Sequence, residues 1–114
     1  METLSFEFVP RDAAVTRPAK TWALTGVLAS GNLEILVEPD GATEVSPGRC
    51  RVEVQTSALG FGDVWQAVLE DFFARHGSAL AGLRFTIHDA GATPAVVSLR
   101  LDQALREFGS PPSP

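Results

Sequence analysis

Cysteine, long apolar runs and clustered basic residues are all scarce in this chain of 114 residues. The single cysteine, Cys50, excludes an internal disulfide and a metal site built from cysteines. No run approaches the roughly 20 apolar residues that cross a bilayer, so we expect no membrane association. The first residues lack the basic start and apolar stretch of a secretory signal, which makes a cytoplasmic protein the expectation.

The charge balance excludes a further class of partner. Nine Lys and Arg residues are scattered along the chain against 14 Asp and Glu residues, which gives a formal net charge of -5. Because phosphate backbones are bound by clustered basic residues, we expect no nucleic-acid partner.

Motifs for self-contained catalysis are missing as well. No Gly-Lys-Ser/Thr phosphate loop occurs, and residues 60–62 (Gly-Phe-Gly) lack the third glycine of a dinucleotide loop. His76 and His88 fall in different predicted elements without a carboxylate cluster, which disfavours a metal site. A triad of Ser30, His88 and Asp89 is disfavoured because neighbours on a strand point to opposite faces. These absences favour a protein that carries, binds or scaffolds.

Alternation of apolar and polar residues predicts the strands of a sheet. The segments 22–28, 33–37, 50–54 and 83–87 are the four predicted strands, and residues 4–8 alternate in the same way at the N-terminus. The residues expected to face inward are Trp22, Leu24, Gly26 and Leu28 in the first segment, Leu33, Ile35 and Val37 in the second, Cys50, Val52 and Val54 in the third, and Leu83, Phe85 and Ile87 in the fourth. Cys50 is therefore expected to be a buried strand residue.

Two segments follow a helical period instead. Asp63 is the expected N-cap of the first helix, with Gln66 as its capping-box partner and Gly77 at its end. Thr93 followed by Pro94 predicts the start of the second helix, which runs to Gly109.

Both helices need one sheet face on which to bury their apolar stripes. The expected fold is thus a two-layer α+β sandwich, with a largely antiparallel sheet of about four strands and two helices on one face. Its order is strand, strand, strand, helix, strand, helix, with the further strand at the N-terminus. Residues 1–109 form one domain, residues 11–20 a loop or flexible arm, and residues 110–114 a disordered Pro/Ser tail.

A serine lies in the turn between two of these apolar strands. Ser30, Gly31 and Asn32 form the connection, and Gly and Asn tolerate the positive φ that tight turns require. The hydroxyl of Ser30 is thereby expected to be exposed on a rigid support. Residue chemistry alone leaves two interpretations open, an ordinary turn residue or a residue with a role in covalent modification or catalysis.

The segment 26–39 resembles the attachment segment of the acyl carrier (delta) subunits of malonate decarboxylases. The related gamma chain of citrate lyase has a similar serine hairpin. A second match covers residues 87–97 and continues through 99–105, and the segments 1–8, 52–57 and 64–66 fit the same family in order. The Gly-Ala-Thr-Pro run at 91–94 favours malonate decarboxylase over citrate lyase.

The resemblance also has departures. Asn32 replaces the more usual Asp, Ala29 replaces a Gly, and Ala90 stands where Phe is common. Residues 11–20 match poorly.

The resemblance implies a noncatalytic carrier subunit for malonate catabolism. Ser30, with Gly31 and Asn32 beside it, would carry phosphoribosyl-dephospho-CoA through a phosphodiester bond, which makes the chain a phosphoprotein. The thiol of that group would hold acetyl and then malonyl as thioesters. The implied partners are the acetyl/malonyl transferase subunit, the decarboxylase subunits and a prosthetic-group transferase. The alternatives are a citrate lyase-type carrier, a noncatalytic interaction module and a small serine hydrolase.

The predicted helix start at residues 91–94 adds a separate hypothesis. The first amide groups of a helix favour anions, so this start could help to hold the phosphodiester if it lies near Ser30. An ordinary capped helix start is the alternative.

Overall fold

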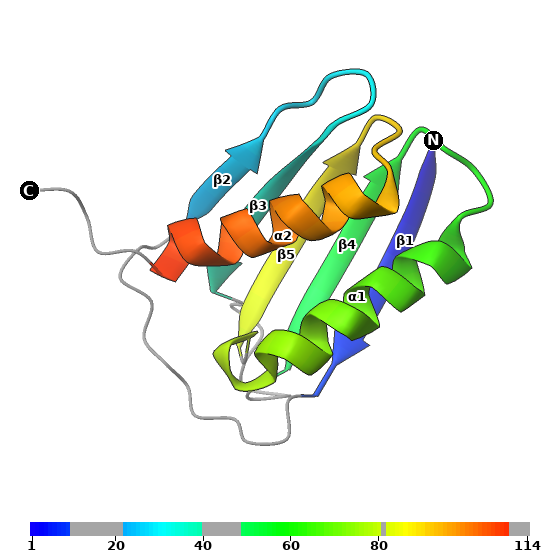
Figure 1. The fold of residues 1–114 in the computed structure, drawn as a ribbon. Helices are drawn as coiled ribbons and strands as arrows, with labels where there is room; N and C mark the ends of the chain where they lie inside the picture. Colours follow the sequence, from blue (N-terminus) through cyan, green and yellow to red (C-terminus); the bar gives the residue numbers. More distant parts are fainter. Residues whose placement is uncertain (10–21, 40–48, 81, 110–114) are drawn as a thin grey trace, which may run out of the picture.

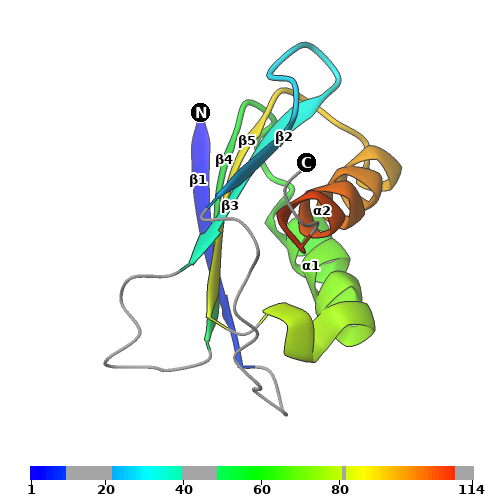
Figure 2. The same ribbon diagram turned by 90° about the vertical axis from the view of Figure 1, so that its left-hand side faces the viewer.

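The chain folds as a five-stranded sheet with both helices on one face (Figures 1 and 2). The computed structural model describes residues 1–9, 22–39, 49–80 and 82–109. The strands are β1 (Glu2–Phe8), β2 (Ala23–Gly26), β3 (Leu33–Pro39), β4 (Cys50–Thr56) and β5 (Leu83–Asp89). The helices are α1 (Gly62–His76), the 3-10 helix η1 (Gly77–Leu80) and α2 (Pro94–Gly109). The predicted α+β sandwich is confirmed, with a fifth strand because the N-terminal segment joins the sheet.

The strands lie in the order β1-β4-β5-β3-β2, and three of the loops between elements gather at one end of this sheet. β4 and β5 are parallel and every other neighbouring pair is antiparallel, so α1 and η1 form the crossover that a parallel pair needs. The loops that follow β4 and β5 therefore leave from the same edge of the sheet. The β2–β3 loop lies at this edge too, as Figure 1 shows, because β3 runs antiparallel to β5.

The core lies between the sheet and the two helices. The inward residues predicted for β3, β4 and β5 are all at most 5% exposed, which confirms the period-two pattern in these strands. The helices contribute the buried side chains Trp65, Leu69 and Phe72 from α1 and Val97, Leu101, Ala104 and Phe108 from α2. Cys50 is fully buried among them, as expected.

The face predicted for β2 is wrong. Ala23 is the buried residue of this edge strand, whereas Trp22 and Leu24 are 59% and 50% exposed, and Leu28 lies beyond the strand. The pairing with β3 fixes this orientation, because Ala23 lies opposite the buried Val37 and Thr25 lies opposite the buried Ile35. Ala23 and Thr25 therefore take the inward face, and Leu24 faces away from the helices.

The two predicted helix starts differ in outcome. α1 begins at Gly62 after Phe61, without a side-chain cap, and Gln66 donates to Glu70 at 2.8 Å, so the capping box is wrong. At the start of α2 the Thr93 hydroxyl accepts from Val96 N at 3.3 Å, which confirms the predicted cap. The predictions for residues 11–20 and 110–114 lie outside the described residues.

Candidate functional site

Ser30 lies at the tip of the loop between β2 and β3, and it is exposed. A tight turn shapes the tip, in which Asn32 N donates to Ala29 O at 2.9 Å and Gly31 takes a positive φ of 75°. Among the residues that the structure describes, none forms a hydrogen bond with the Ser30 hydroxyl. The turn thus presents an unoccupied hydroxyl group.

The loop is fastened to a second loop that follows β5. Gly31 N donates to Ala90 O at 2.8 Å, and Ala90 N donates to Asn32 O at 3.0 Å. This pair of bonds continues the antiparallel β3–β5 ladder beyond its last strand pair, Leu33 with Asp89. Ser30 is therefore exposed on backbone that is held immediately on its C-terminal side.

The side chain of Asn32 adds a third attachment. Its Oδ1 accepts from Leu33 N at 2.8 Å and from Arg100 Nε of α2 at 3.2 Å. Arg100 also donates from Nη1 to Gln103 Oε1 at 2.8 Å. Since Asn32 and Arg100 are 68 positions apart, no local pattern in the sequence marked Arg100 as part of this site.

A buried polar pair fixes the neighbouring loops. Asp89, which is 5% exposed, accepts from Thr56 Oγ1 at 2.8 Å and from Ala92 N at 2.9 Å. The two residues pair at the ends of the parallel strands β4 and β5. His88 points to the helix-free face, with its Nδ1 3.9 Å from Glu34 Oε1. Asp89 and His88 thus have separate partners, and no contact between Ser30 and either of them occurs among the described residues.

The start of α2 is close to the Ser30 loop, as the phosphodiester hypothesis required, because Ala90 directly precedes the 91–94 segment. However, side chains already accept from two of the local amides. Ala92 N donates to Asp89, and Val96 N donates to Thr93. The ordinary capped start describes this segment best.

A cavity of about 280 Å³ opens between the first turns of the two helices. Its wall is mainly apolar and comes from α1, α2 and the two loops after β4 and β5. The principal lining residues are Phe61, Val64, Trp65, Val68, Pro94 and Val97. Asp89 and Gly91, which flank Ala90, also line it. The cavity therefore shares a wall with the segment that fastens the Ser30 loop.

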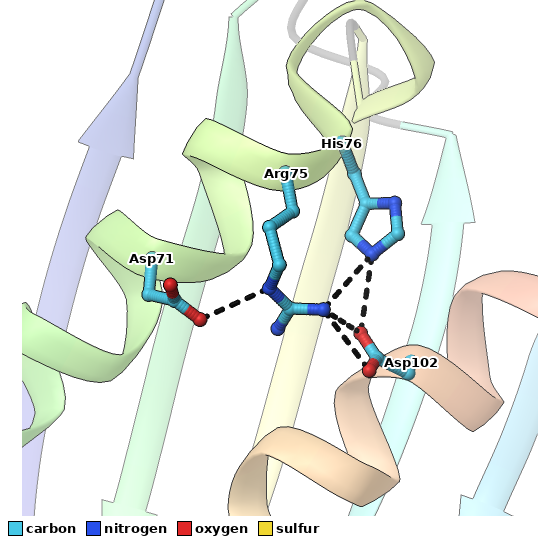
Figure 3. Close-up of polar contacts among 4 residues, drawn as sticks. All are labelled: Asp71, Arg75, His76 and Asp102. Atoms are coloured by element: carbon cyan, nitrogen blue, oxygen red, sulfur yellow. Dashed lines mark hydrogen bonds and ion pairs between the residues drawn. The ribbon is translucent and has the colours of Figure 1, made fainter.

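A separate polar cluster joins the two helices (Figure 3). Arg75 of α1 donates to Asp102 of α2 at 2.9 Å and to Asp71 at 3.0 Å, and these bonds raise the pKa of Arg75 above its usual value. His76 Nε2 lies 3.1 Å from the same Asp102 oxygen. Arg75 and His76 lie in the last turn of α1, at the end of the sheet opposite Ser30. The cluster links the helices and contributes nothing to the Ser30 loop.

The described part of the chain shows neither a metal-binding cluster nor a membrane-spanning helix. It contains no group of three or more His, Cys, Asp or Glu side chains that could hold a metal ion. Nor is any of its helices long and apolar enough to span a membrane.

Comparison with known proteins decides the family. The family model described as "Malonate decarboxylase delta subunit (MdcD)" matches residues 20–108. The chain belongs to the malonate decarboxylase delta-subunit family. The preference for malonate decarboxylase over citrate lyase, made from the 91–94 run, is thereby confirmed.

Members of the delta-subunit family match this chain over almost its whole length. A malonate decarboxylase acyl carrier protein of Xanthomonas campestris pv. campestris (strain B100) is 53% identical over 107 residues, which are 92% of each chain. One of Burkholderia cepacia is 50% identical over 111 residues, 96% of this chain and 93% of that one.

A solved structure agrees with the fold. A chain in the crystal structure of a Pseudomonas malonate decarboxylase hetero-tetramer in complex with malonate is 44% identical and superposes with a TM-score of 0.77. The match covers 96% of this chain and all of that one.

Proposed function

We propose that this chain is the acyl carrier subunit of a malonate decarboxylase complex, and that Ser30 is the attachment point of phosphoribosyl-dephospho-CoA. The observation that carries the proposal is the exposed hydroxyl of Ser30, which has no partner among the described residues and lies on a fastened loop, in a chain of this family. A phosphodiester bond to Ser30 Oγ would replace the hydroxyl proton, and no existing hydrogen bond among the described residues has to break.

The surroundings of Ser30 fit a bulky group. Ser30 is exposed, and a Cβ atom added to the neighbouring Gly31 would meet nothing within 4 Å, so the tip of the loop has open space around Gly31. When bound, the group would supply a thiol on a long arm that carries acetyl and malonyl as thioesters. The chain's own residues would hold the anchoring oxygen in place and leave the arm free to turn outward.

A fixed anchor suits a carrier. An arm tethered near two active sites has a high effective concentration at each, provided that its anchor can approach both. The bonds from Gly31, Asn32 and Arg100 hold the base of the loop, while Ser30 itself protrudes. We propose that the arm visits the active sites of the acetyl/malonyl transferase subunit and of the decarboxylase subunits.

Ser30 lacks the groups that would make it a nucleophile for its own reaction. No histidine or carboxylate in the described part of the chain is hydrogen-bonded to its hydroxyl, so nothing there would take its proton. We therefore assign the attachment step to a separate prosthetic-group transferase and the decarboxylation chemistry to other subunits. The interaction module and the small hydrolase remain the competing outcomes of the test below.

Intact-mass measurement after co-expression with the modifying enzymes of the family tests the proposal. Wild-type protein is expected to gain the mass of phosphoribosyl-dephospho-CoA less one water, because the phosphodiester replaces the hydroxyl proton of Ser30 and a hydroxyl group of the phosphate. Ser30→Ala should gain nothing. Ser57→Ala is the matched control, because Ser57 is an exposed serine in a loop at the same end of the sheet. Folded wild-type protein that stays unmodified beside active modifying enzymes would favour the interaction module, and a simple acyl ester on Ser30 would favour the hydrolase.

A further inference from the structure

The attachment step does not use the cavity between α1 and α2. The cavity opens to the surface and is lined by the loops that follow β4 and β5, which lie at the end of the sheet that carries the Ser30 loop. Its wall consists mainly of apolar side chains, with the carboxylate of Asp89 already engaged by Thr56 and Ala92. Such a concave, mostly apolar site suits a small organic ligand and not an ion.

The connection between the cavity and Ser30 is short. Ser30 precedes Gly31, whose amide donates to Ala90 O at 2.8 Å, and the next residue, Gly91, lines the cavity. Consecutive Cα atoms are only about 3.8 Å apart, so two single-residue steps and one hydrogen bond join the attachment residue to the cavity wall. A flexible arm anchored at Ser30 can therefore fold back over the loop after β5 and enter.

We propose that this cavity receives the acyl-bearing end of the chain's own prosthetic arm between visits to the partner subunits; this rests on the attachment at Ser30 proposed above. The arm of a CoA-type group ends in a pantetheine chain that combines apolar carbons with amides. Phe61, Val64 and Trp65 would bury the carbons and the short acyl group, while the open mouth leaves the amides near water.

Such a site has a chemical use. Hydrolysis of a thioester needs water at the acyl carbon, where a C–O bond forms, the C–S bond breaks and the sulfur leaves as thiol. An apolar wall lowers the local concentration of water around that carbon. The cavity thus shields the thioester while the exposed Ser30 loop keeps the arm available to partners.

Two tryptophans give a built-in probe and its reference. Trp65 lines the cavity, whereas Trp22 precedes β2 and is 59% exposed. In nuclear magnetic resonance spectra of the wild-type chain, loading and then acetylation should shift the indole N–H signal of Trp65. The Trp22 signal should stay within the linewidth of its position in the unloaded protein.

A pair of variants tests the role of the cavity itself. Val64→Tyr places a larger ring at the cavity wall, at a helix position that is already 40% exposed. Ala74→Tyr introduces the same ring at an exposed position of α1 outside the cavity. We expect Val64→Tyr to abolish the acetyl-dependent Trp65 shift and to shorten the half-life of the acetyl thioester at least threefold. Ala74→Tyr should match the wild type in both measurements.

The two proposals fail in different ways. If intact mass shows loading of all three proteins but neither the Trp65 signal nor the thioester half-life depends on residue 64, the cavity proposal is overturned and the attachment proposal stands. If the wild type is never loaded under conditions in which the modifying enzymes are active, both are overturned.

Discussion

Asn32 is held through a single atom, its side-chain oxygen, which accepts from both Leu33 N and Arg100 Nε. A carboxylate offers the same acceptor at the same place, so the structure explains how either Asn or Asp fits this turn. An aspartate would add charge to the contact with Arg100 and strengthen it. The departure at position 32 therefore leaves the geometry of the Ser30 loop intact.

Asn32→Asp should accordingly raise the free energy of unfolding by about 1 kcal/mol, because one neutral hydrogen bond becomes charge-assisted. Urea unfolding followed by circular dichroism measures the change. In the background of Arg100→Met the same substitution should give no gain. If Asn32→Asp raised the free energy of unfolding equally with and without Arg100, the contact between residues 32 and 100 would not be the source of the added stability.

Gly26 and Gly31 both have positive φ, but they differ in their surroundings. A Cβ on Gly26, at φ 88°, would collide with the carbonyl oxygen of Leu33, whereas a Cβ on Gly31 would meet nothing within 4 Å. Gly31→Ala should therefore cost about 1 kcal/mol of stability from backbone strain alone. Gly26→Ala should cost about 3 kcal/mol, since the strand ends must also separate. Equal urea midpoints for the two variants would contradict this account.

At the scale of elements, the sequence predicted those strands whose two faces differ clearly in polarity. Leu33, Ile35 and Val37 alternate with polar or half-exposed neighbours in β3, and the helices cover the apolar side. The prediction for β2 failed because Leu24, and Trp22 just before the strand, are exposed at this edge of the sheet. The pairing register with β3 decided that orientation, and the sequence of a single strand does not reveal its register.

Helix termini show a similar limit. The cap of α2 was predictable because Thr93 acts on its own backbone neighbourhood. The start of α1 was not, because the helix begins at Gly62 after Phe61 and no side chain caps it, so Asp63 lies inside the first turn. A residue that is suited to capping predicts a cap only where the backbone ends its helix at that residue.

The ion cluster of Figure 3 makes a prediction about the two helices together. Asp102→Asn removes the carboxylate that joins α2 to Arg75 and His76 of α1, so it should lower stability modestly. The loss should shrink in 1 M salt, roughly the concentration at which the screening length falls to 3 Å. Asp71→Asn, which removes a pair within α1 only, should have a smaller effect in urea unfolding.

The pH dependence of this cluster follows from Arg75. Its pKa is raised by the bonds to Asp102 and Asp71, so its charge and the stability that it contributes are present below its usual pKa and are lost only above it. The difference between wild type and Asp102→Asn should therefore stay constant between pH 8 and pH 10. A difference that falls steadily over this interval would assign the stabilisation to another group.

At the scale of the whole molecule, the mixed sheet explains why the site could be predicted only in part. Ser30, Gly31 and Asn32 are adjacent in the sequence, and their turn was predictable from residue type. Arg100, Ala90 and the cavity reach the same end of the domain through the parallel pairing of β4 and β5 and the position of α2. That arrangement depends on the order of the strands in the sheet, which the alternation of apolar and polar residues does not predict.

The same arrangement predicts how the domain responds to loading. Because bonds from Gly31, Asn32 and Arg100 already hold the Ser30 loop, a group attached to Ser30 should leave the fold unchanged. Backbone chemical-shift changes between unloaded and loaded protein should be confined to residues 27–32 and 89–94 and to the cavity wall. Arg75 and Asp102 toward the opposite end serve as internal references, and Gly31 N–H should exchange with solvent more slowly than Ser30 N–H in both forms. Chemical-shift changes that spread to β1 or to the cluster of Arg75 and Asp102 would show instead that attachment reorganises the domain. The hydrogen bonds of the Ser30 loop would then not make it a rigid anchor.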